Sequence, residues 1–118
     1  MAERWKLVVR DGPTVRRSFH STLGEALDGL QAETAEAANR SPAREVDLRF
    51  RSYGPEDRVV MRAEVKGPQR RFAKVTAGVD VRGDGRLEPW LGGARRSEVE
   101  VRKRETAWQA LRRALGVD

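Results

Sequence analysis

Alternation of apolar and polar residues is the feature that most limits what this chain can fold into. The runs 46–50, 59–65 and 73–81 each place an apolar side chain at every second position, and turns rich in Gly and Pro separate them. A period of two puts alternate side chains on opposite faces of a strand. The pattern therefore predicts three consecutive antiparallel strands, with one apolar face and one charged face.

The segments on either side predict a hairpin and two helices. Residues 5–19 alternate around an Asp-Gly-Pro turn, which is typical of a β-hairpin. Thr22 and Thr106 are each followed three residues later by Glu or Gln, a capping box, and then by an apolar stripe. These signals predict helices over 22–38 and from Thr106 to Gly116.

The segments 87–91 and 98–101 add one edge strand or loop and one short strand. The expected fold is a single α+β domain over 1–118. It has an antiparallel sheet of five to six strands with two helices on one face, in the order ββαβββ(β)(β)α.

Composition excludes several kinds of site. The chain has no Cys and a single His, His20, so it cannot form disulfides, thiolate zinc sites or a site that needs two His. No apolar run approaches the ~20 residues of a membrane span, and we expect a cytoplasmic protein without a membrane partner. No catalytic residue, metal site or cofactor is predicted.

Charge is abundant and unevenly distributed. The chain has 20 Arg and four Lys, and its formal net charge is +6. Residues 21–47 hold six acidic and two basic groups, whereas 48–118 hold 17 basic and ten acidic groups. The preference for Arg over Lys is also typical of a GC-rich genome, so the arrangement of the charges is more informative than their number. An anionic partner would dock on the sheet and the last helix, away from the acidic first helix.

The leading hypothesis is a small, non-enzymatic module that contacts DNA or RNA. Period two places Arg49, Arg51 and Arg62 together on the charged face of the sheet, and further basic clusters occupy turns and the entry to the last helix. Such a surface contacts phosphates through Arg forks. The predicted nucleic-acid-binding residues are Arg49, Arg51, Arg62, Arg70, Arg71, Arg95, Arg96, Arg102, Lys103 and Arg104. The competing interpretation is a solvated surface on which nearby carboxylates pair with these cations.

From residue 22 onward, the order helix, three strands, helix is similar to a double-stranded RNA-binding domain. The local match is the basic run Arg102, Lys103 and Arg104 before the last helix, where that family grips phosphates across a groove. The chain departs from the family in the extra segment 83–101 and in its acidic first helix, so the likeness is one of shape.

Two alternatives remain open. In a protein-interaction or assembly module, Trp90, Leu91 and the acidic helix 22–38 would contact another chain, or an edge strand would join a second copy. In a metal-dependent nuclease, the more distant alternative, Asp47 would face Glu64 across a hairpin of 46–52 with 58–66, with Lys66 beside them.

Overall fold

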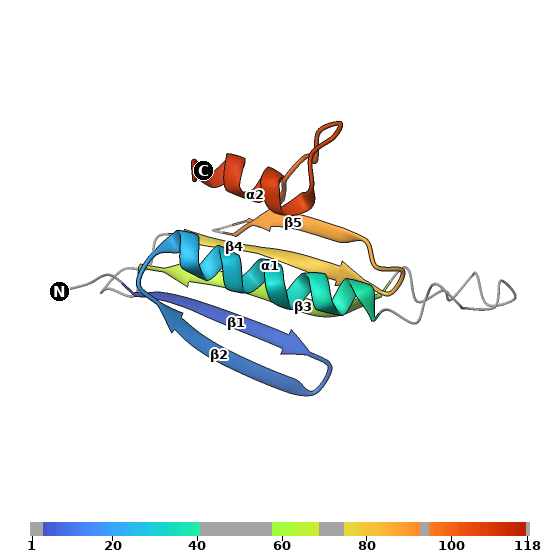
Figure 1. The fold of residues 1–118 in the computed structure, drawn as a ribbon, viewed down its shortest axis with the longest axis horizontal. Helices are drawn as coiled ribbons and strands as arrows, with labels where there is room; N and C mark the ends of the chain where they lie inside the picture. The colour runs from blue at the N-terminus through green and yellow to red at the C-terminus, as the bar shows by residue number, and fades with distance from the viewer. Residues whose placement is uncertain (1–3, 41–57, 69–74, 93–94, 118) are drawn as a thin grey trace, which may run out of the picture.

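Six antiparallel strands and two helices form the part of the chain that the structure, a computed structural model, describes: residues 4–40, 58–68, 75–92 and 95–117 (Figure 1). Along the sheet, the strands run β2-β1-β3-β4-β5-β6. The elements are β1 (Trp5–Asp11), β2 (Thr14–His20), α1 (Leu23–Asn39), β3 (Val59–Gly67), β4 (Val75–Arg82), β5 (Leu87–Leu91), β6 (Ser97–Glu98) and α2 (Ala107–Leu115). The predicted α+β fold is confirmed.

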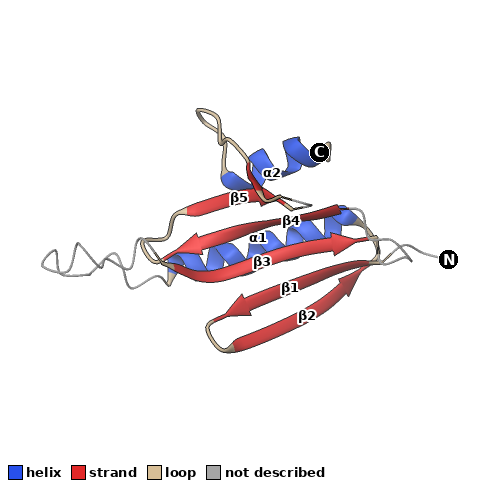
Figure 2. Ribbon diagram, turned by 180° about the vertical axis from the view of Figure 1, so that it is seen from behind, coloured by secondary structure: helices blue, strands red, loops and turns tan. Residues whose placement is uncertain are grey.

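Both helices lie on one face of the sheet, and the core lies between them and the strands (Figure 2). The apolar side chains that alternate along the three central strands meet Leu27 and Leu30 of α1 and Leu111 of α2. A partly buried polar contact joins the helices, in which Trp108 Nε1 donates to Thr34 Oγ1 at 2.8 Å. The strand residues of this core include Trp5, Leu7, Val9, Met61, Ala63, Val65, Ala77, Val79 and Val81.

The helix ends follow the sequence signals. Thr22 Oγ1 accepts from the backbone N–H of Glu25 at the start of α1, and Thr106 forms a reciprocal capping box with Gln109 at the start of α2. These contacts satisfy N–H groups that have no partner within a helix. Gly116 ends α2 with φ of +72°, a left-handed conformation that glycine adopts without the steric cost a side chain brings.

The predicted pairing of 46–52 with 58–66 is wrong, although the strand over 58–66 itself is confirmed as β3. The two edges of β3 pair with β1 and β4, so Glu64 lies opposite Val8 and Gly78 rather than Asp47. Residues 46–52 and Asp47 lie outside the described residues. Alternation shows which side chains share a face of a strand, but it does not show which strand lies beside it.

Candidate functional site

The face of the sheet opposite the helices, called here the open face, carries most of the charged strand residues. Residues that pair across neighbouring strands point to the same face, so the strand register arranges the open face in three rows. Row A is Phe19, Lys6, Lys66 and Thr76; row B is Arg17, Val8, Glu64, Gly78, Trp90 and Glu98; row C is Val15, Arg10, Arg62, Asp80 and Glu88. Of the described helices, neither covers this face (Figure 2).

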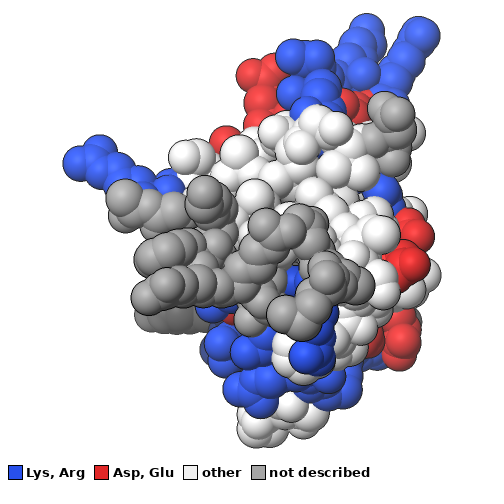
Figure 3. Space-filling view, turned by 90° about the vertical axis from the view of Figure 1, so that its left-hand side faces the viewer, with Lys and Arg blue, Asp and Glu red and all other residues white. Residues whose placement is uncertain are grey.

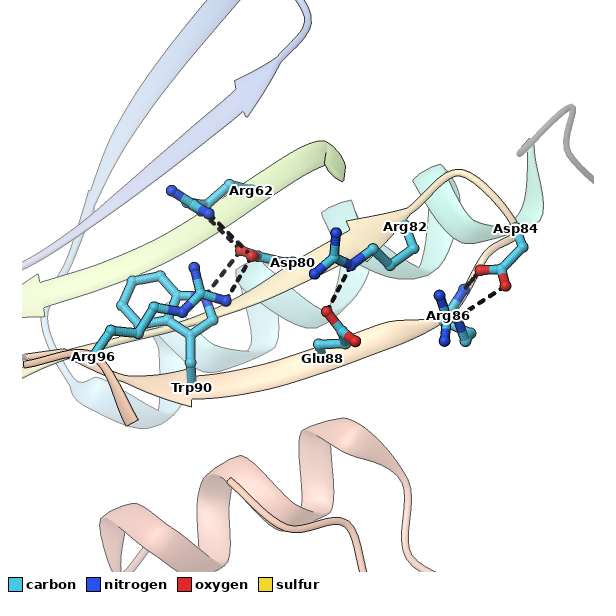
Figure 4. Close-up of polar contacts among 8 residues, drawn as sticks. All are labelled: Arg62, Asp80, Arg82, Asp84, Arg86, Glu88, Trp90 and Arg96. Atoms are coloured by element: carbon cyan, nitrogen blue, oxygen red, sulfur yellow. Dashed lines mark hydrogen bonds and ion pairs between the residues drawn. The ribbon is translucent and has the colours of Figure 1, made fainter. Parts of the chain in front are cut away.

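Asp80 is the centre of a hydrogen-bonded network on this face (Figure 4). Its side chain is 1% exposed, and each carboxylate oxygen accepts two bonds. Oδ1 accepts from Arg62 Nε at 2.8 Å and from Trp90 Nε1 at 3.0 Å. Oδ2 accepts from Arg62 Nη2 at 3.0 Å and from Arg96 Nη2 at 2.7 Å. Burial raises the pKa of Asp80, but the hydrogen bonds and charges of Arg62 and Arg96 together lower it below its ordinary value.

Trp90 belongs to this network and is not an exposed interface residue. Its side chain is 5% exposed and lies over Gly78, where an added Cβ would come within 2.5 Å of the indole. The guanidinium of Arg96 lies 4.9 Å from the ring centroid and that of Arg62 lies 5.9 Å from it. Leu91 is half-buried. Trp90 is buried in this arrangement, and the predicted partner contact through Trp90 and Leu91 stays a prediction.

Of the predicted nucleic-acid-binding residues that the structure describes, two from distant segments meet. Arg62 and Arg96 meet at Asp80, with side chains 39% and 35% exposed. Arg95 is exposed just before β6. The exposed residues Arg102, Lys103 and Arg104 lie in the loop before α2, which projects beyond the sheet (Figure 1). Arg49, Arg51, Arg70 and Arg71 lie outside the described residues.

A second group of cations lies where β1 and β2 pair, and sequence reasoning missed it. Phe19 is 49% exposed on β2, with the guanidinium of Arg4 4.2 Å from its ring centroid and Lys6 directly opposite on β1. Arg17 lies two residues along β2 on the same face. We call Arg4, Lys6, Arg17 and Phe19 the hairpin patch. Figure 3 shows Lys and Arg gathered at the β1–β2 end of the molecule.

Within the described chain, neither Lys6 nor Arg17 makes an ion pair. The hairpin patch therefore offers charge that carboxylates of the described chain do not neutralise. Its signal in the sequence was the alternation of Lys6 and Arg10 with apolar residues. The alternation alone does not show that these residues cluster, because it is the strand register that places Phe19 beside Lys6.

Among the described residues of the open face, cations outnumber carboxylates. The cations are Arg4, Lys6, Arg10, Arg17, Arg62, Lys66, Arg82 and Arg96, and the carboxylates are Glu64, Asp80, Glu88 and Glu98. The exposed side of α1 carries acidic residues instead, Glu25, Asp28 and Glu36. A polyanion therefore meets an attractive surface on the sheet and a repulsive one on α1.

A pocket of about 290 Å³ opens beside row C, between β1 and β3. Arg10 and Arg62 line it together with Gly12 and residues 59–61. Glu64 lies 3.7 Å from Arg10 at one side, and Asp80 holds Arg62 at the other. The pocket thus has two guanidinium groups anchored by carboxylates, an arrangement that suits a phosphate group.

The geometry required for the nuclease hypothesis is not formed by the described residues. Glu64 lies 3.7 Å from both Arg10 and Lys66, and Val8 and Gly78 occupy the positions opposite it. Across the described ranges, no group of three or more acidic or His side chains is placed to hold a metal ion. In the same ranges, no helix has the length and apolarity needed to cross a bilayer.

Comparison with known proteins found no matching family model, no matching curated protein and no matching solved structure.

Proposed function

We propose that this chain is a non-enzymatic module that binds nucleic acid on the open face of its sheet. The observation that carries the proposal is the excess of cations on that face, and above all the half-buried Lys6 and the exposed Arg17 of the hairpin patch, which have no ion pair among the described residues. Neutralising phosphates releases condensed counterions, and that release is a main source of affinity for nucleic acids.

The Asp80 network supports the proposal because it fixes two arginines in place. Arg62 uses two of its five N–H donors on Asp80, and Arg96 uses one. The remaining donors can bind phosphate oxygens. A guanidinium that its partner already holds loses less side-chain entropy when it binds a ligand. Arg62 also lines the pocket with Arg10, which makes that pocket the best place for one phosphate.

The test is a titration of short DNA and RNA against the full chain at about 50 and about 200 mM salt. Affinity should fall steeply with salt, with a slope of about −0.7 to −0.9 for each phosphate neutralised. The double variant Lys6→Glu/Arg17→Glu should abolish binding at the higher salt.

The matched control is Arg102→Glu/Lys103→Glu, which changes net charge by the same amount at the α2 entry. Retained binding in this control assigns the ligand to the open face, whereas loss in the control alone would move the site to the entry of α2. If the wild-type chain binds neither DNA nor RNA at about 50 mM salt, the proposal is wrong.

A protein-interaction module remains the alternative, and β2 is the observation that favours it. β2 lies at the edge of the described sheet, and six of its seven residues are exposed. An extended segment of another chain can add to such an edge. A second copy fits less well, because antiparallel self-pairing would bring Arg16 and Arg17 close to their own copies. A mass equal to the monomer in light scattering would exclude self-association.

A further inference from the structure

Resting on the proposed function, we infer that the ligand is a single-stranded nucleic acid, with a base that stacks on Phe19. The inference concerns the form of the ligand, which a cation excess alone does not determine. It comes from one exposed aromatic ring and its surroundings in the hairpin patch.

Phe19 has the surroundings of a stacking platform. Among the described residues it is the only aromatic side chain of the exposed class, at 49% exposure. The guanidinium of Arg4 lies 4.2 Å from the centroid of the Phe19 ring, and Lys6 on β1 is the residue that pairs directly with Phe19. Proteins that bind single strands combine aromatic rings, on which bases stack, with cations that follow the backbone. Arginine adds to such a platform because its guanidinium plane also stacks on bases.

The rows of the open face continue this arrangement toward the middle of the sheet. Row A runs from Phe19 to Lys6 and then to Lys66, and Arg17 lies one row along β2. A single-stranded nucleic acid whose base stacks on Phe19 therefore has cations for its phosphates on β1, β2 and β3. These cations lie along one extended surface of the sheet. Such a surface suits a flexible single-stranded nucleic acid, whose bases are free to turn toward the protein.

A duplex fits the described surface less well. Its bases stack on one another, so an exposed ring has no base to receive, and recognition would fall to helices or loops that reach a groove. The exposed side of α1 carries Glu25, Asp28 and Glu36, and although Arg112 and Arg40 pair with the last two, that side lacks the excess of cations found on the described part of the open face. Among the described loops, the basic one suited to a groove is the α2 entry at 102–104, and the control variant above tests it separately.

The experiment compares a labelled single strand of about 12 nucleotides with a hairpin duplex of the same sequence, by fluorescence anisotropy at one salt concentration. The single strand should bind more tightly. Phe19→Leu keeps an apolar side chain but removes the ring, and it should weaken single-strand binding by about five- to 150-fold. The slope of affinity against salt should stay unchanged, because no charge is altered.

Two further variants separate stacking from loss of structure. Phe19→Trp should retain the affinity, and its emission should be quenched by the single strand beyond any change in the wild type. Val15→Ala is the matched control, since Val15 is the other exposed apolar residue of β2 on the same face, and it should bind as the wild type does.

The outcomes separate the inference from the function beneath it. Binding of neither form overturns the proposed function and the inference with it. Duplex binding as tight as single-strand binding leaves the function standing and overturns the inference. Wild-type affinity in Phe19→Leu, or equal losses in Phe19→Leu and Val15→Ala, also overturns it, because stacking on this ring would then contribute nothing specific.

Discussion

Asp80→Asn should destabilise the protein by about 2–4 kcal/mol, although it barely changes the shape of the side chain. Asp80 Oδ1 accepts from Arg62 and Trp90, and Oδ2 accepts from Arg62 and Arg96. An Asn that keeps its oxygen in the place of Oδ1 retains the first two bonds. Its NH₂ group then faces two guanidinium N–H donors, so both bonds to the second position are lost.

The magnitude follows from those two bonds and from the exposure of their donors. A hydrogen bond to a charged group contributes about 1.5–3 kcal/mol, which gives about 3–6 kcal/mol for two. The side chains of Arg62 and Arg96 are 39% and 35% exposed, so the released donors turn partly to water. That resolvation lowers the expected loss to about 2–4 kcal/mol.

Urea unfolding measures this loss, and Glu88→Gln is the matched control. With an m-value of about 2 kcal/mol/M, the Asp80→Asn midpoint should fall by about 1–2 M. Glu88 lies opposite Asp80 on β5, and its carboxylate pairs with Arg82 at 2.7 Å but is 30% exposed. Its loss should cost no more than about 1 kcal/mol. Equal losses in the two variants, or less than about 1 kcal/mol for Asp80→Asn, would refute this account of the network.

The difference in free energy of unfolding between the wild type and Asp80→Asn should disappear at low pH. Burial raises the pKa of Asp80, but the contacts from Arg62 and Arg96 bring it below its ordinary value. A carboxyl with a lowered folded pKa stabilises the protein above its unfolded pKa, near 4, and loses that contribution as the pH falls through the folded pKa. Below about pH 4, the wild type should therefore lose stability faster than the variant. A gap that stays constant down to about pH 2 would contradict the assignment.

Three further substitutions test the scaffold of the site, each by urea unfolding. Gly78→Ala should lower the free energy of unfolding by about 1–3 kcal/mol, because the new Cβ would meet the indole of Trp90 and a backbone oxygen at 2.5 Å. It should also shift the fluorescence emission of Trp90 to longer wavelength. Unchanged emission would show that the ring does not rest on this glycine. Thr34→Val should cost about 1–3 kcal/mol by removing the acceptor for Trp108 Nε1. Thr106→Ala should cost about 1 kcal/mol by removing the α2 cap, and no loss would mean that water replaces it.

The strands and helices were predictable because their signals are local. A capping box and an alternating run each fix a segment without reference to the rest of the chain. The neighbour of β3 was not predictable from alternation, but one signal did point to it. Leu7, Val8 and Val9 are consecutive apolar residues, and all three are buried. A run without alternation is more typical of a strand with a neighbour on each side than of an edge strand, and β1 does lie between β2 and β3.

The site was only partly predictable because the register assembles it. Arg62, Asp80 and Arg96 come from three segments, and Arg62 and Asp80 are direct partners only because β3 pairs with β4 in one register. Asp80 stands in the apolar run of β4, where a carboxylate must have partners to be buried. That requirement is visible in the sequence, but the identity of the partners is not.

The number of arginines is a poor guide to binding, because the fold divides them into two groups. On the helix side they pair with carboxylates of the strands, of the helices and of the entry to α2. The contacts are Arg16 to Glu33 at 3.0 Å, Arg40 to Asp11 at 2.8 Å, Arg112 to Asp28 at 2.6 Å and Arg113 to Glu105 at 2.9 Å. The Arg113 side chain, helped by the backbone N–H of Arg102, lowers the pKa of Glu105 to about 2.

The carboxylates of α1 therefore neutralise arginines of β2, α2 and the end of α1 itself, and they do not reach the open face. Part of the cation excess of the described chain therefore lies on that face, where Lys6 and Arg17 of the hairpin patch make no ion pair with a described residue, and another part lies in the exposed loop 102–104. A substitution that adds an acid to α1 should leave ligand binding almost unchanged, whereas an acid at Lys6 or Arg17 should remove it. The proposed binding of a polyanion therefore rests on this separation of charge by the sheet rather than on the net charge of the chain.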